Sequence, residues 1–188
     1  MENKNIIEEI RRFVEEESKK PSAKYDFEIY KFHFVPMREY AVKLAKKLNA
    51  DIEIVELAAW LHDIGSVIYG RENHHITGAG IAEKKLKELN YPEEKIGKIK
   101  LCILNHRGSV NNCRISIEEQ IISDADAISN FDNLTGVFAG VLLYEKLNQE
   151  EAKISVRKKL QRKYEQLYLE ESKIIIKPKF EAAMILLN

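Results

Sequence analysis

Apolar residues recur at intervals of three and four along almost the whole chain, and no segment alternates apolar and polar residues for long enough to build a sheet. This spacing gives each segment one apolar face, which is the pattern of an amphipathic helix. The sequence therefore predicts an all-α fold. Helices are expected over about 3–18, 34–48, 51–62, 74–89, 92–106, 116–129, 133–147, 150–170 and 180–187.

Several helix ends are marked by single residues. Asp51 is a good N-cap, and Ser116 with Glu119 forms the pattern of a capping box. Gly65 is expected to end the third helix and to begin a looser stretch over 65–73. The GSVNNCR segment at 108–114 is expected to be a loop, in which Asn111 and Asn112 could contact a base or sugar. Residues 174–177 are compatible with an extended segment or with the start of the last helix.

The chain has 188 residues, with 30 basic and 30 acidic side chains. This length favours one domain, and the zero net charge argues against a partner that is a nucleic-acid polymer. The amino terminus lacks the apolar stretch of a signal peptide, and no later stretch is long enough to span a membrane. Two isolated cysteines favour a reducing compartment, so a cytoplasmic location is expected.

All five histidines lie between positions 33 and 106, and the acidic run Ser-Asp-Ala-Asp follows at 123–126. Borderline divalent metals prefer imidazole nitrogen together with carboxylate oxygen. Helical bundles assemble such sites from side chains on successive helices. The pattern therefore predicts a metal site. The candidate ligands are His33, His62, Asp63 and Asp126 for one ion, with His74 and His106 available for a second.

Other polar residues near these positions have ordinary structural interpretations. Asp124 is interpreted as a surface residue of its helix. His75 would point about 100° away from His74 on a helix, so it is interpreted as a surface residue or as a neighbour of the ligands. Trp60 is expected to pack in the core. The basic run at 157–163 is flanked by glutamates and is interpreted as a solvated helix face.

Residues of about 28–132 resemble the HD superfamily of metal-dependent phosphohydrolases, whose pattern is H…HD…D on an all-α core. The resemblance rests on His33 with the helix that follows it, on VELAAWLHDIG around His62-Asp63, on the segment from His74 to Ala82, on KIKLCILNHR, and on IISDADAISNFD. It implies a core of about 28–132 within a single domain of residues 1–188. Residues 133–188 would then be a C-terminal helical extension whose role the sequence leaves open.

The resemblance also implies the metal ligands. These are His33, His62, Asp63 and Asp126, with His74 and His106 matching the positions that hold a second ion in the two-metal branch of the superfamily. The ions would be one or two divalent transition metals, namely Mn, Fe, Ni, Co or Zn. The alternative is a single ion, with His74 and His106 facing the substrate phosphate as acids or hydrogen-bond donors.

The implied activity is hydrolysis of a small phosphate ester or anhydride by a metal-bound hydroxide, with nucleotides as the leading substrate class. Asp63, His74 and His106 would take part in catalysis. Arg107 is the favoured cation for the transition-state charge, and Arg38 and Arg71 are alternatives. A di-iron oxygenase on the same ligands and a non-catalytic nucleotide-binding sensor are the competing functions. Monomer and homodimer are both compatible with the sequence.

Overall fold

The structure is a computed structural model that describes residues 2–107 and 113–188. These residues form helices joined by short connections and contain no strand, which confirms the all-α class. Within this part of the chain, no helix combines the length and apolarity needed to cross a membrane. The elements are α1 (Glu2–Lys19), η1 (Tyr30–Phe34), α2 (Val35–Leu48), α3 (Ile52–Leu61), α4 (Ile64–Tyr69), α5 (His74–Glu88), α6 (Glu93–Asn105), α7 (Ile117–Ser129), α8 (Leu134–Ala139), η2 (Gly140–Tyr144), α9 (Gln149–Glu165) and α10 (Glu170–Leu186).

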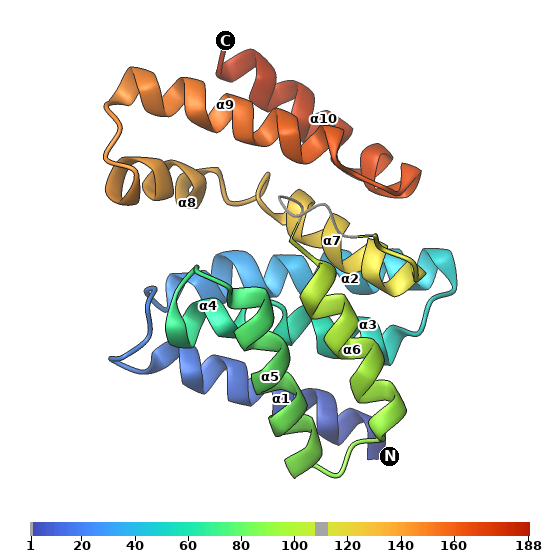
Figure 1. Ribbon diagram of the computed structural model, residues 1–188. Coiled ribbons are helices and arrows are strands. Elements are labelled where there is room, and N and C mark those ends of the chain that lie inside the picture. Colours follow the sequence, from blue (N-terminus) through green and yellow to red (C-terminus); the bar gives the residue numbers. More distant parts are fainter. Residues whose placement is uncertain (1, 108–112) are drawn as a thin grey trace.

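Helices α1 to α7 pack into one body, and α8, α9 and α10 lie over one side of it as a second layer (Figure 1). Helix α3 forms the centre of the body. Every residue from Ile54 to Leu61 is buried, and the helix packs against α1, α2, α6 and α7. A helix that is apolar on nearly all sides belongs inside a core. The end of α3 therefore places His62 and Asp63 in the interior.

The predicted helix starts are largely confirmed. The Asp51 side chain accepts hydrogen bonds from the first turn of α3, and Ser116 and Glu119 form a reciprocal capping box at the start of α7. The helix predicted from residue 34 is preceded by the π-helical turn η1, whose Tyr30 ring stacks on Trp60 in the core. Turns of this kind occur often at functional sites. Here the turn carries His33.

The expectation that Gly65 ends a helix is wrong. Helix α3 ends at Leu61, and Gly65 lies inside the short helix α4, within the stretch that was expected to be loose. A Cβ atom on Gly65 would lie 2.2 Å from the carbonyl oxygen of His74 and 2.7 Å from the amide nitrogen of Gly78. Glycine is therefore required for the close approach of α4 to the start of α5, and not for a helix stop.

The C-terminal end of the chain is more regular than expected. Residues 174–177 lie within α10, which continues through Pro178 to Leu186. The short helix predicted over 180–187 is thus the last part of a longer one. The loop predicted over 108–114, including Asn111 and Asn112, lies mainly outside the described residues.

Asp124 fixes the C-terminal layer to the core. It accepts hydrogen bonds from the backbone N–H groups of Tyr168 at 3.0 Å and Leu169 at 2.9 Å, at the junction of α9 and α10. The prediction that Asp124 is a surface residue is wrong, since its side chain is buried. An ionised carboxylate accepts backbone N–H bonds strongly, so the contact links α7 to the second layer.

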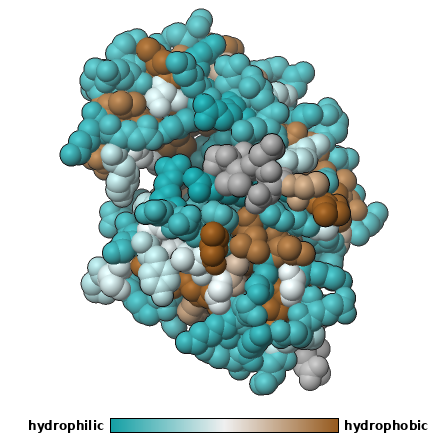
Figure 2. All heavy atoms as spheres, viewed as in Figure 1, coloured by the Kyte–Doolittle hydropathy of each residue, from teal (hydrophilic) through white to brown (hydrophobic). Residues whose placement is uncertain are grey.

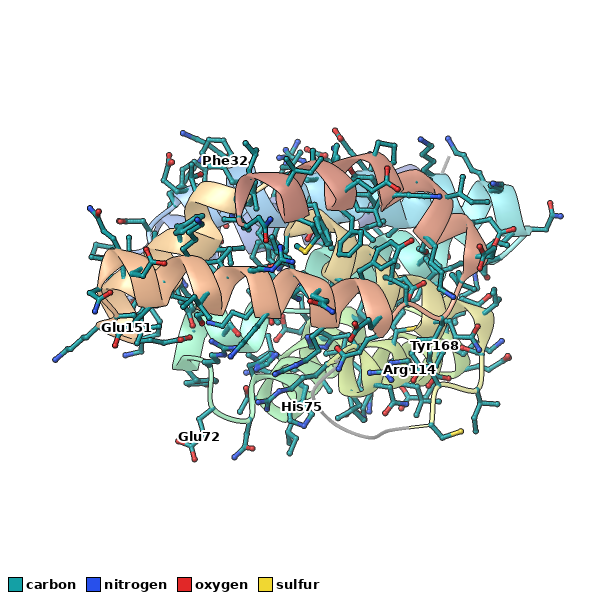
Figure 3. All side chains as sticks on the ribbon, turned by 90° about the horizontal axis from the view of Figure 1, so that it is seen from above. Phe32, Glu72, His75, Arg114, Glu151 and Tyr168 are labelled. Atoms are coloured by element: carbon teal, nitrogen blue, oxygen red, sulfur yellow. The ribbon has the colours of Figure 1, made fainter. Side chains whose placement is uncertain are left out.

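Two further contacts join the layers. The guanidinium of Arg114 donates a hydrogen bond of 2.6 Å to the hydroxyl of Tyr168, and the two side chains lie together in Figure 3. On another side, the rings of Tyr25 and Tyr144 meet edge to face with centroids 6.2 Å apart. The surface is hollowed where the layers meet (Figure 2). The extension is therefore attached at several points around this boundary.

Candidate metal centre

The predicted ligands come from η1 and from helices α3 to α7, which converge below the second layer. His33 lies on η1, and His62 and Asp63 form the junction between α3 and α4. His74 is the first residue of α5, His106 directly follows α6, and Asp126 lies on α7. Packing of the core helices thus brings together residues as far apart in the sequence as His33 and Asp126, which are 93 positions apart. The folded chain brings all six predicted ligands into one region.

The first cluster combines two imidazoles with a carboxylate. The Nε2 atoms of His33 and His62 are 3.0 Å apart, and the Oδ2 atom of Asp63 lies 3.6 Å and 3.8 Å from them. The Oδ1 atom of Asp126 lies 3.6 Å from the Nε2 atom of His33. His33, His62 and Asp63 are close enough together to hold one ion, with Asp126 beside them.

The second cluster uses the other oxygen of the same carboxylate. The Oδ1 atom of Asp63 lies 3.2 Å from the Nε2 atom of His74 and 3.7 Å from that of His106. The two imidazole Nε2 atoms are 3.3 Å apart. These three residues form a second group that could hold an ion. Asp63 is shared by both groups, which is the arrangement of a bridging ligand.

The imidazole rings are oriented by their Nδ1 atoms. In His62, His74 and His106, Nδ1 lies 2.9, 2.8 and 2.6 Å from the backbone carbonyl oxygen three residues earlier. A carbonyl oxygen can only accept, so each Nδ1 must carry a hydrogen. In the neutral ring, Nε2 then presents a lone pair. Bonds of this kind are how proteins orient histidines that bind metals.

His33 follows the same logic through a hydroxyl group. Its Nδ1 atom lies 3.3 Å from the Oγ atom of Ser129, whose own hydrogen is donated to the carbonyl oxygen of Asp126. The hydroxyl oxygen therefore accepts from Nδ1 of His33, and the Nε2 lone pair faces the cluster. Ser129 also connects the ring of His33 to the helix that carries Asp126.

The donor set fits divalent metal ions. Ligands at about 2.1 Å from an ion are roughly 3.0 Å apart at right angles and roughly 3.4 Å apart at tetrahedral angles. The separations in both clusters, from 3.0 to 3.8 Å, match or slightly exceed these values. Neutral imidazoles with lone pairs facing each other at 3.0 Å repel unless a cation or a proton lies between them. A donor set of imidazole nitrogens and carboxylate oxygens favours borderline metals, whereas magnesium prefers sites made of oxygen ligands.

The electrostatics prepare most of these groups for binding. Burial lowers the pKa of His62 to about 4, so its ring is neutral at neutral pH. Burial by itself would raise the pKa of Asp63, but the imidazoles of His62, His106 and His33 hold it well below its usual value. Burial is likewise outweighed at Asp126, where Lys163 and His33 lower the pKa to about 2. Both carboxylates are therefore ionised.

The arginines considered from the sequence differ in their positions. Arg38 forms an ion pair with the buried carboxylate of Glu56 on α3, with 2.7 Å from Nε to Oε1. The charge of the Arg38 guanidinium is therefore paired with that of Glu56. Arg71 is exposed. Arg107 is half-buried directly after His106, and its carbonyl oxygen accepts a hydrogen bond from Arg114. A role for Arg107 at a substrate phosphate stays a prediction.

His75 belongs to neither cluster. Its half-buried ring lies beside that of His74, with centroids 5.7 Å apart. Burial and the neighbouring charges of His74 and Arg107 lower the pKa of His75. Its position agrees with the interpretation of a neighbour of the ligands. Trp60 is buried against Tyr30, as expected of a core residue.

Lys163 is the residue near the centre that sequence reasoning missed. It belongs to the basic run at 157–163, which was interpreted as a solvated face, yet its Nζ atom lies 3.7 Å from the Oδ2 atom of Asp126. Its separation from Asp126 is 37 residues, and nothing in the local pattern distinguishes it from Lys158 or Lys159. Only the packing of α9 over α7 reveals it.

Comparison with known proteins identifies the fold. The model of the HD domain family matches residues 31–130, slightly more than half of the chain. An HD-superfamily hydrolase from Bacillus thuringiensis has a TM-score of 0.75 at 19% identity, covering 98% of this chain and 93% of that one. The structure of Bacillus subtilis YpgQ in complex with ADP has a TM-score of 0.73 at 19% identity, covering 99% and 92%. At these identities the likeness shows a shared fold.

One segment of the chain matches part of a larger protein. Over 53 residues the chain is 42% identical to a tRNA (cytidine(56)-2'-O)-methyltransferase from Thermoplasma volcanium. The match covers 28% of this chain and 16% of the methyltransferase, so this chain spans about one sixth of that relative.

Proposed function

The chain belongs to the HD domain family, and we propose that it is a metal-dependent phosphohydrolase that cleaves a small phosphate ester or anhydride, with nucleotides as the substrate class. The observation that carries this proposal is the position of Asp63. One of its oxygens faces His33 and His62, and the other faces His74 and His106. Two adjacent ions sharing one carboxylate are suited to clamp a phosphoryl group.

In this proposal His33, His62, Asp63 and Asp126 hold one divalent transition-metal ion, and Asp63, His74 and His106 hold a second. Bound ions of the Mn, Fe, Ni, Co or Zn class would acidify a water molecule and attract the phosphoryl oxygens. The chain's own contribution is to hold the donors in place. The Nδ1 contacts of the histidines hold the rings in orientations in which the Nε2 atoms face the two clusters, where the ions would bind.

Positive charge is also needed where the phosphoryl oxygens gather negative charge. Arg107 directly follows His106 and is our proposed cation on the side of the second cluster. The half-buried position of Arg107 suits a side chain that contacts a ligand while part of it stays in water.

Two observations support a nucleotide as substrate. The neighbour YpgQ was crystallised with ADP. In the present chain, burial and then the charge of Asp63 raise the pKa of Tyr25. Tyr144 contacts Tyr25 and is 67% exposed, so its ring offers a face on which a base could stack.

The test is elemental analysis of the purified protein together with a phosphate-release screen over mono- and dinucleotides, with and without chelator. We expect transition metal in the protein and nucleotide hydrolysis that chelation abolishes. Uptake of dioxygen with iron bound and no phosphate release would favour the oxygenase alternative. Nucleotide binding without conversion would favour the sensor.

Single substitutions test the assigned ligands. His62→Ala and Asp63→Ala should each abolish metal-dependent turnover, because each removes a ligand that the other donors cannot replace. Helical content, measured by circular dichroism, should be largely unchanged. Full activity in either variant would contradict the assigned site.

A further inference from the structure

We propose that the C-terminal helix α9 completes the active site and that Lys163 binds a phosphate group of the substrate. This inference rests on the proposed phosphohydrolase function, and it adds a substrate contact that lies outside the segment matched by the family model, residues 31–130. It also gives the C-terminal extension a role in binding.

Lys163 lies against Asp126 at the metal centre. The Oδ1 atom of Asp126 faces His33, whereas Oδ2 faces the Nζ atom of Lys163 at 3.7 Å. This distance is longer than a hydrogen bond. Among the described residues, Asp126 is the only ionic partner of Lys163, and no hydrogen bond engages its ammonium group. With 30% of its side chain exposed, Lys163 keeps donors available for a ligand.

Other cations on the same helix are directed elsewhere. Lys159 forms an ion pair with Glu145, and Arg157 donates a hydrogen bond of 2.8 Å to the carbonyl oxygen of Met184. Lys158 and Arg162 are exposed. Within the basic run, Lys163 is thus the cation whose ammonium group lies against a predicted metal ligand.

The position of Lys163 is fixed by the fold and not by a loose tail. Asp124 holds the junction of α9 and α10, only a few residues beyond Lys163. Tyr164 stacks on Phe180 of α10 with ring centroids 4.0 Å apart. Asp124 and Asp126 are two positions apart on α7, so their side chains point about 200° apart around the helix. One carboxylate anchors the second layer while the other belongs to the metal centre.

Charge explains why an anion is expected there. Asp63 and Asp126 contribute two carboxylate groups to the clusters, and the charge of a single divalent ion would balance them. A second ion, or the ammonium of Lys163, then leaves an excess of positive charge around the centre. A phosphate group that binds between the ions and Lys163 would neutralise that excess, and charge-assisted N–H···O bonds are the strong ones.

The experiment compares Lys163→Met with Lys163→Arg, and Lys158→Met serves as the matched control because Lys158 lies on the same helix and is exposed. The readouts are metal content, calorimetric affinity for ADP and for adenosine, and KM and kcat for phosphate release. We expect Lys163→Met to keep its metal and its adenosine affinity but to bind ADP about 10-fold or more weakly. Lys163→Arg should retain most of the ADP affinity, and Lys158→Met should match the wild type.

The outcomes separate this inference from the proposed function. Unchanged ADP affinity in Lys163→Met overturns the phosphate contact, even if the wild type hydrolyses nucleotides. A loss of metal from Lys163→Met that parallels the loss of affinity also overturns it, since Lys163 would then only orient Asp126. A wild type that binds ADP through Lys163 but releases no phosphate overturns the hydrolase and leaves the contact standing. A wild type that binds no ADP overturns the phosphate contact, while the phosphate-release screen still decides the hydrolase.

Discussion

His74 and His75 are neighbours in the sequence, but only the ring of His74 reaches the shared carboxylate of Asp63, at 3.2 Å. We predict that His74→Ala lowers the metal content from two ions toward one, because it removes one of three donors from the second cluster. His75→Ala is the matched control and should leave the content unchanged. Elemental analysis after dialysis against a weak chelator measures the difference. An equal metal content in His74→Ala and the wild type would favour the single-ion alternative.

A proton competes with the metal at His106. Burial disfavours the charged ring, but the hydrogen bond and charge of Asp63 outweigh it and raise the pKa of His106. In the metal-free protein this proton stabilises the fold at pH values below the unfolded pKa, and the stabilisation is lost as the pH rises through the folded pKa. A bound ion must displace the same proton.

Metal affinity should therefore increase as the pH rises through the raised pKa of His106. At pH values below the raised pKa of His106, each chain should release on the order of one proton on metal binding, since the carboxylates of Asp63 and Asp126 are already ionised and His62 is already neutral. Calorimetric titrations with metal in buffers of different ionisation enthalpy measure this number. Affinity that does not change with pH would contradict the assignment of His106 as a ligand.

At the residue scale, the ligands were predictable and their surroundings were not. His33, His62, Asp63, His74, His106 and Asp126 are distinguished by residue type and by a pattern spread along the helices. No sequence pattern distinguishes Asp124 or Lys163 from other polar residues, because an aspartate or lysine on an amphipathic helix is ordinarily solvated. Their contacts join α7 to segments about 40 residues away, and local spacing contains no information on such contacts.

At the scale of elements, the approach of α4 to α5 depends on Gly65. We predict that Gly65→Ala lowers the free energy of unfolding by about 1–3 kcal/mol, because the added Cβ atom meets backbone atoms that cannot move independently. It should also weaken metal binding, since His74 is displaced from Asp63. Urea denaturation and metal titration measure the two effects.

Gly80 provides the control for this substitution. It lies in the middle of α5, is exposed, and a Cβ atom there would meet nothing within 4 Å. Gly80→Ala should therefore raise stability by about 0.5–1 kcal/mol through helix propensity alone. If Gly65→Ala were equally harmless, the close helix contact would not be a requirement of the fold.

Helix positions were mostly predictable because apolar periodicity and capping residues are local signals. The predictions failed where a residue serves a long-range contact, as at Gly65, and where a regular segment lacks a strong apolar face. Residues 174–177 are part of α10 because this helix packs against α9 and α7. This packing outweighs the low helix propensity of Pro178. The π-helical turn that carries His33 had no sequence signal.

At the scale of the whole molecule, the two layers are coupled through Asp124. We predict that Asp124→Ala destabilises the protein by about 2 kcal/mol, because it leaves the part-buried N–H group of Tyr168 and the buried N–H group of Leu169 without their acceptor. Chemical denaturation measures this loss. Asp124→Asn keeps one acceptor oxygen and should retain part of the stability.

The same substitution tests whether the layers act together. If α9 places Lys163 at the metal centre, Asp124→Ala should also weaken ADP binding while the metal content stays close to that of the wild type. Unchanged ADP affinity in a folded Asp124→Ala protein would show that the second layer holds its position without this anchor.

The sequence by itself determined the all-α class, most helix positions and the residue types of the metal centre. Apolar periodicity and the chemistry of ligand side chains are properties of short segments, so they can be recognised without the tertiary structure. Only the tertiary structure decided that one carboxylate, Asp63, faces two histidine pairs with its two oxygens. It also decided that the C-terminal layer reaches the centre through Lys163. Both depend on how helices pack, and the distances between packed helices follow from the whole set of buried contacts and not from any single segment.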